Sequence, residues 1–184
     1  MEFIANNYPN SSVNKRFISY CNSILEREVS GYRFIGETIT PITNEGEIAE
    51  IEEALQIAKA LGPVAIHLNS ALEKLSDKKS PDFRNSIKES ISAVEAISSH
   101  IASKDKAELA EALTILAEKI QLHSALRQGF IKLYGYTSDA DGIRHALLEE
   151  PALDFEDAKF MLVACSAFIN YLKVKASKAG IDLT

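Results

Sequence analysis

The sequence contains no tryptophan, no low-complexity tract and no internal repeat. No stretch approaches the roughly 18 consecutive apolar residues that a membrane-spanning helix needs, so we expect no membrane partner. The first seven residues, MEFIANN, carry neither a basic leader nor an apolar signal core. We therefore expect a cytoplasmic protein.

Metal ligands and reactive loops are also scarce. Cys21 and Cys165 lie inside helical patterns, which predicts reduced core residues and no disulfide. No histidine pairs with another histidine or a cysteine at the spacing of a zinc helix. Asp139-x-Asp141-Gly142 opens like a calcium loop, but Ile143 then takes a ligand position and Arg144 the glycine position. With no glycine-rich phosphate loop either, we expect neither a metal nor a cofactor.

Composition and charge further limit the kinds of protein that this chain can be. A length of 184 residues with 46% hydrophobic residues suits one domain with a sizeable core. The net charge of −6 argues against sequence-blind coating of nucleic acid, which needs an overall basic face. Two local basic clusters remain, namely Lys78, Lys79, Arg84 and Lys88, and Arg127, Lys132, Arg144 and His145. Clusters of this size are typical of solvated surfaces.

Apolar residues recur at helical spacing along most of the chain, which predicts an all-α fold, an antiparallel helical bundle. One small β-hairpin is expected at about residues 32–42, around Gly36-Glu37. Residues 1–12 are polar and turn-like and predict a flexible lead-in, followed by a single helical domain over residues 13–184.

Local signals place several helix ends. Gly31 is expected to end the first helix in a left-handed conformation, and Thr43 or Asn44 to cap the next. Pro63 suits a first helical turn. Ser80-Pro81 predicts the start of a long helix that ends near Ala102. We expect this helix to pair antiparallel with the other long helix, which begins near Phe155.

Arg144-His145 is the most chemically pointed local feature, because it enters a short helical stretch directly after a polar loop. Histidine both donates and removes protons near neutral pH, and a guanidinium binds phosphate through two hydrogen bonds. The pair therefore suits metal-independent RNA cleavage, in which a base activates the ribose 2′-hydroxyl. The alternative is structural, with Arg144 capping a helix and His145 bonding the loop.

A second feature lies near the start of the long helix from Pro81. Arg84, Asn85 and Lys88 share a polar face where backbone N–H groups also favour an anion, so they are candidate substrate-binding residues. The alternative is a solvated face in which Lys88 pairs with a carboxylate.

Several strings together resemble a known family. They are SGYRFI at 30–35, PIT at 41–43, PDFRNSIKESISAVE at 81–95, KLYGYTSD at 132–139, GIRH at 142–145 and DAKFMLV at 157–163. The chain resembles the HEPN-like region of AbiJ-type abortive-infection (phage-defence) proteins over about residues 17–171.

This resemblance implies a helical bundle that forms a homodimer, with a composite ribonuclease site at the dimer interface that cuts RNA on phage infection. The usual signature arginine, separated from the histidine by four to six residues, falls here on Ser138, Asp139 or Ala140, so only His145 carries over by position. Two readings stay open: a metal-independent endoribonuclease, and a non-catalytic dimerisation or sensor module that binds RNA or nucleotide. A further defence-system or antitoxin-like partner is also left open.

Overall fold

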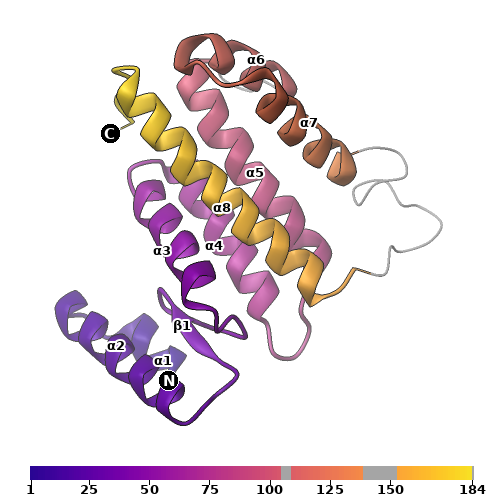
Figure 1. The fold of residues 1–184 in the computed structure, drawn as a ribbon. Coiled ribbons are helices and arrows are strands. Elements are labelled where there is room, and N and C mark those ends of the chain that lie inside the picture. The colour runs from indigo at the N-terminus through magenta and orange to yellow at the C-terminus, as the bar shows by residue number, and fades with distance from the viewer. Residues whose placement is uncertain (105–108, 139–152, 184) are drawn as a thin grey trace.

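A computed structural model describes residues 1–104, 109–138 and 153–183 of the chain. Within these ranges the fold is all-α with one small hairpin, as the sequence predicts (Figure 1). The elements, in chain order, are α1 (Glu2–Asn7), α2 (Ser11–Arg27), β1 (Arg33–Ile35), β2 (Thr38–Thr40), α3 (Glu45–Ala58), α4 (Gly62–Ser76), α5 (Phe83–Ala102), α6 (Leu109–Ile120), α7 (Ser124–Ser138) and α8 (Phe155–Lys178).

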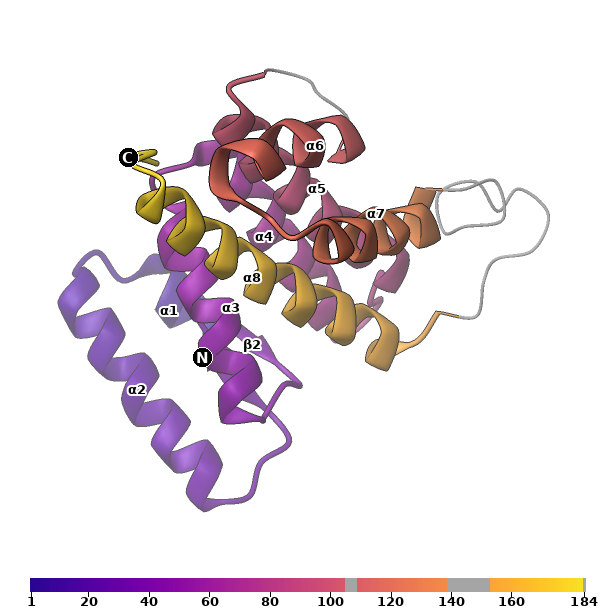
Figure 2. The ribbon, with the colours of Figure 1, turned by 45° about the horizontal axis from the view of Figure 1, so that its top comes forward.

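The main core lies between α3, α4, α5 and α8, and α6 and α7 extend it at one end (Figures 1 and 2). The apolar stripe of α5 is fully buried there, as its helical spacing predicts. Its members Ile87, Ile91, Val94, Ile97 and Ile101 are each at most 2% exposed. The α8 helix is long and apolar enough to cross a membrane, but much of its apolar side packs inside this core.

The two longest helices, α5 and α8, pack together but run in the same direction, so the antiparallel prediction is wrong. Phe83, the first residue of α5, contacts Phe155, the first residue of α8, edge to face at 6.4 Å between ring centroids. Both views show the two helices rising side by side from this end (Figures 1 and 2). Helix direction follows from how intervening elements return the chain, which periodicity alone does not encode.

Polar contacts fix α3 and α4 against these helices. The side chain of Asn170 on α8 donates to the Glu50 backbone carbonyl at 3.0 Å and to the Glu50 carboxylate at 2.8 Å. Ser86 on α5 donates to the carbonyl of Ala71 on α4 at 2.8 Å. The bonds give partners to the Asn170 side-chain N–H groups and to the Ser86 hydroxyl, both largely buried, so the pairs set helix register as well as contact.

A smaller second core holds the N-terminal elements together. Ala5 of α1, Cys21 of α2 and Phe34 of β1 are buried there. Residues 1–12 therefore contain α1 and the start of α2 instead of the turn-like lead-in predicted from their polar composition. Asn6 and Asn7, read as turn residues, donate side-chain hydrogen bonds to carbonyls one helical turn earlier.

The hairpin has the predicted position and turn. Phe34 faces Ile39 and Ile35 faces Thr38, with Gly36 at φ 56° in the first turn position. Glycine takes a positive φ without strain, and a turn of this kind matches the twist of paired strands.

The helices before the hairpin complete its two edges. The Asn22 amide on α2 donates to the Phe34 carbonyl at 3.0 Å and accepts from the Phe34 N–H at 2.7 Å. The Glu2 carboxylate on α1 accepts from the Ile39 N–H at 2.7 Å. Side chains of α1 and α2 thus take the place of neighbouring strands, which leaves these groups of a two-stranded sheet paired.

Two predicted helix ends shift. The left-handed position after α2 belongs to Val29, at φ 53°, and not to Gly31. The N–H of Ser30 bonds the carbonyl of Leu25 and the N–H of Val29 that of Glu26, which is the Schellman pattern. α5 begins at Phe83, because Asp82, and not Ser80, caps it by accepting from the Asn85 N–H. Asn44 caps α3 and Pro63 lies in the first turn of α4, both as predicted.

Candidate functional site

The predicted substrate-binding residues lie together on the first two turns of α5 but do not form an open anion site. Asn85 donates its side-chain amide to Asp82 at 2.7 Å, and its backbone N–H also bonds the Asp82 carboxylate. Arg84 is half-buried and Lys88 is exposed. The helix N-terminus that would attract a phosphate thus already holds a carboxylate.

The ionisation of Asp82 strengthens this conclusion. Burial raises the pKa of its carboxyl group, but hydrogen bonds from the side chain and backbone of Asn85, with the charges of Lys74 and Arg84, outweigh that effect. The net pKa is lowered, so the group is firmly anionic at neutral pH. A substrate phosphate would face this charge at close range.

His145 and Arg144, the predicted catalytic pair, lie outside the described residues. The chain on either side is placed: α7 ends at Ser138, and α8 begins at Phe155 against Phe83. Desolvation, and then the charges of Asp157 and Asp154, raise the pKa of Tyr136 on the last turn of α7. Tyr136 on α7 therefore lies near the start of α8, which in turn contacts the start of α5.

A histidine–carboxylate pair that no sequence pattern predicted joins α4 and α5. The Nδ1 of His67 lies 2.7 Å from the Glu89 carboxylate, with side chains 35% and 24% exposed. The two residues are 22 positions apart, so only the antiparallel packing of α4 on α5 brings them together. Such a contact fixes the orientation of the imidazole ring.

The cysteines and acidic residues offer little further chemistry. Burial raises the pKa of the Cys165 thiol to about 12 and also raises that of Cys21, so both are protonated at neutral pH. Among the described residues, no group of three or more His, Cys, Asp or Glu side chains is arranged to hold a metal ion.

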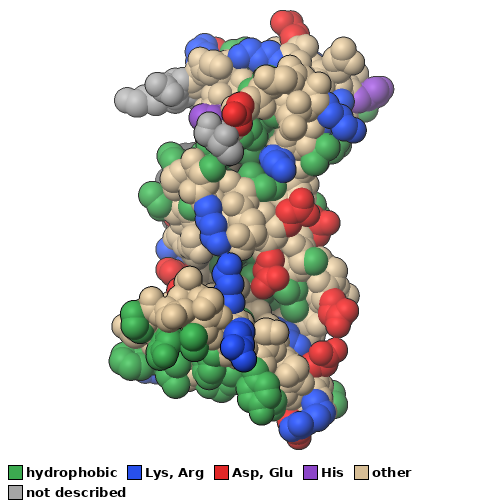
Figure 3. All heavy atoms as spheres, turned by 90° about the vertical axis from the view of Figure 1, so that its left-hand side faces the viewer, with side chains coloured by type: hydrophobic (Ala, Val, Ile, Leu, Met, Phe, Trp, Pro, Cys, Tyr) green, Lys and Arg blue, Asp and Glu red, His purple; other side chains and the backbone are tan. Residues whose placement is uncertain are grey.

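An exposed apolar surface lies on the N-terminal helices α1 and α2. Hydrophobic side chains gather at the end of the molecule that carries α1 and α2 (Figure 3). We define the α1/α2 patch as Phe3, Ile4, Val13, Phe17 and Tyr20. Of these, Phe3 is 78% and Tyr20 67% exposed. The polar composition of residues 1–12 predicted a lead-in, so the patch was not expected from the sequence.

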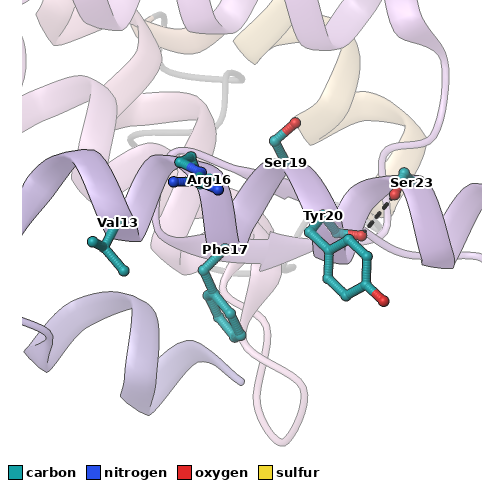
Figure 4. Close-up of a pocket in the computed structure, with 6 residues that line it drawn as sticks. All are labelled: Val13, Arg16, Phe17, Ser19, Tyr20 and Ser23. Carbon is teal, nitrogen blue, oxygen red and sulfur yellow. Dashed lines mark hydrogen bonds between the residues drawn. The ribbon is translucent and has the colours of Figure 1, made fainter.

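A shallow trough runs along α2 beside the patch. Val13, Phe17 and Tyr20 line it together with Arg16, Ser19 and Ser23 (Figure 4). The aromatic and aliphatic side chains project on one side of the helix, and Arg16 lies at their edge. Contiguous exposed apolar surface of this kind is typical of protein interaction sites.

The described residues thus form a helical fold with an exposed apolar surface on its N-terminal helices. Residues 1–56 match the family model described as AbiJ N-terminal domain 4. The match spans α1, α2, the hairpin and most of α3, so it includes the whole α1/α2 patch. It relates this part of the chain to AbiJ-type abortive-infection proteins. No curated protein and no solved structure matches the chain significantly.

Proposed function

We propose that the protein acts in abortive-infection phage defence, as a non-catalytic helical module that contacts a partner. The observation that carries the proposal is the match of residues 1–56 to an AbiJ N-terminal domain. The α1/α2 patch supports the contact role, because it exposes aromatic side chains within the matched residues. The filled N-terminus of α5 supports a role other than phosphate chemistry for Arg84, Asn85 and Lys88.

Phage challenge tests the defence role. Cells that express the full chain should release fewer phage per infected cell, while survival at high phage-to-cell ratio does not rise. This combination distinguishes abortive infection from a block on phage entry, which would raise survival. Unchanged phage yield across a broad phage panel would contradict the proposal.

Metal-independent RNA cleavage, the HEPN-like activity, is the second candidate. The observation in its favour is that the chain containing Arg144 and His145 leads from α7 into α8, whose first residue contacts Phe83, the neighbour of Arg84. In this proposal His145 transfers the proton and Arg144 or Arg84 binds the phosphate. The proposed homodimer would combine sites from two copies.

The small residues of α5 do not provide a surface for that dimer. Small residues such as Ser86, Ser90 and Ala93 permit close approach of another helix, but each is 0% exposed within one chain. Ser86 bonds a carbonyl of α4, and Ser90 bonds that of Ser86. A dimer interface therefore has to lie elsewhere. Light scattering at high micromolar concentration tests it, and a monomer there would contradict the dimer.

The ribonuclease candidate predicts cleavage of mixed RNA in chelator by the full chain. His145→Ala should lower the rate by roughly 10²–10⁴, because proton transfer by a positioned side chain contributes about that much. His100→Ala is the matched control, since His100 is exposed near the end of α5. Cleavage that His145→Ala leaves unchanged would exclude this mechanism. If the wild type cleaves no RNA, the non-catalytic binding module is the reading that remains.

A further inference from the structure

The apolar face of α2 is only partly covered by its own chain. Cys21 turns inward to the small core, whereas Val13 is 41% and Tyr20 67% exposed on the same broad apolar side. Within its own chain, α2 contacts mainly α1 and β1. The helices of the main core do not cover its exposed apolar side. Helices of folded proteins bury such stripes against a neighbour, so this one lacks a partner.

The charge at the edge of the trough indicates what the partner carries. Arg16 lines the trough and makes no hydrogen bond or ion pair within the described part of the chain. A guanidinium beside aromatic side chains is the composition found at the energetic centres of protein interfaces. The trough holds no carboxylate, so a matching ligand supplies one next to its apolar side chains.

A second copy of this chain does not fit that requirement. Pairing of α2 with its own copy about a twofold axis brings Arg16 and Arg27, which lie on the same edge of the helix, against the same edge of the other copy. Glu26 projects about 120° away from Tyr20 around the helix. Glu28 already pairs with Arg27 at 2.8 Å. Antiparallel self-association would thus bring the two Arg16 edges together without a carboxylate of α2 free to pair with either Arg16.

Single-stranded nucleic acid also fits less well. Binding of a phosphate backbone uses a track of cations between the stacking aromatics. Here the trough has one cation, and the α1/α2 patch also includes Phe3 and Ile4 of α1, at 78% and 49% exposure.

We infer that the α1/α2 patch binds an acidic amphipathic helix of another protein. The apolar residues of that helix lie on Val13, Phe17 and Tyr20, and a carboxylate of it pairs with Arg16. This inference rests on the proposed role as a contact module and adds the chemical class of the partner. It uses the recognition mode in which a helix presents residues at i, i+3, i+4 and i+7 to an apolar groove.

A designed peptide pair tests the inference. The probe is a fluorescent helical peptide with leucines at i, i+3, i+4 and i+7 and glutamates on its remaining positions. Its counterpart replaces every glutamate with lysine. Fluorescence anisotropy with the full chain should give at least about tenfold tighter binding for the acidic peptide, because opposite charge at the contact favours it.

Two variants locate the contact. Tyr20→Ser should weaken binding of the acidic peptide by at least about tenfold, as loss of an aromatic anchor does. Arg16→Glu should reverse the preference in favour of the basic peptide. Ile66→Ser and Phe160→Ser are matched controls, because they remove 68% and 60% exposed apolar residues from α4 and α8. All four side chains are solvent-facing, and circular dichroism checks that each variant folds.

Several outcomes overturn the inference. Equal affinity for both peptides, or no saturable binding, removes the acidic helix as ligand. Binding of poly(U) RNA that Tyr20→Ser abolishes assigns the surface to nucleic acid, and a dimer that Tyr20→Ser dissociates assigns it to a second copy. Phage challenge separates this failure from that of the defence role. Protection of cells from phage without peptide binding would contradict only the proposed class of partner. Peptide binding without protection would contradict only the proposed defence role.

Discussion

Single residues mark where the chain departs from its simplest conformations. Val29 is 88% exposed and takes φ 53°, although its branched Cβ makes a left-handed backbone costly. The hydrogen bonds of Ser30 and Val29 to the last turn of α2 hold it there. The residue ends the helix at a conformational cost that glycine would avoid.

Val29→Gly should therefore raise the free energy of unfolding by about 1 kcal/mol, since glycine takes the left-handed conformation without Cβ strain. Urea denaturation measures the change. Val29→Ala is the control, because alanine keeps a Cβ and should recover less of the gain. Destabilisation by Val29→Gly would show that the exposed valine makes stabilising contacts.

Asp82 links the stability of α5 to pH. Its folded-state pKa is lowered, so its contribution to stability is present above the unfolded pKa and is lost as pH falls through the folded pKa. Asp82→Ala should cost about 1 kcal/mol at pH 7, as loss of an N-cap does. The difference from wild type should shrink on acidification below about pH 4. A difference independent of pH would contradict the ionised cap.

At the scale of elements, the sequence predicted where helices lie better than how they pack. The N-cap at Asn44, Pro63 in the first turn of α4 and the end of α5 at Ala102 all follow local rules, and all are confirmed. The direction of α8 and the pairing of His67 with Glu89 depend on tertiary contacts between distant residues. No local pattern encodes such contacts.

For the candidate sites too, the sequence predicted the positions of residues along the chain but not their side-chain contacts. The sequence correctly placed Arg84, Asn85 and Lys88 on one helical stretch, but the engagement of Asn85 with Asp82 emerged only from the side-chain geometry. The α1/α2 patch was missed because Asn6, Asn7 and Pro9 suggested a turn. Within α1 the two asparagines bond their own helix, and this leaves Phe3 and Ile4 on an ordered surface.

The joint between α2 and β1 depends on one side chain. Asn22→Ala removes the hydrogen-bond partners of both the Phe34 N–H and the Phe34 carbonyl, and Phe34 is fully buried. The free energy of unfolding should fall by about 2–3 kcal/mol, because these buried polar groups are then left unpaired. Thermal or urea denaturation measures the loss. Ser23→Ala, at the exposed neighbouring position, should be near neutral. Equal effects of the two variants would mean that the Asn22 bridge contributes little.

At the scale of the whole molecule, the described chain has two cores of unequal size. Three buried residues form the N-terminal core, whereas the main core joins the four helices α3, α4, α5 and α8, with α6 and α7 at its end. The N-terminal unit is connected through the hairpin, which contacts α3 and α4, and through the ion pair of Glu2 with Lys78 at 3.1 Å. The part that matches the AbiJ family model thus includes the less extensively buried end.

This inequality predicts two levels of stability. Amides of α2 should exchange with solvent through local opening of the N-terminal unit, because few apolar contacts oppose it, whereas amides of α5 and α8 should exchange only on global unfolding. Native-state hydrogen exchange in low denaturant measures both. Asn22→Ala should speed exchange in α2 and leave the mid-helix amides of α8 less affected. Equal protection of α2 and α8, or an equal loss in both, would show that the two cores unfold as one cooperative unit.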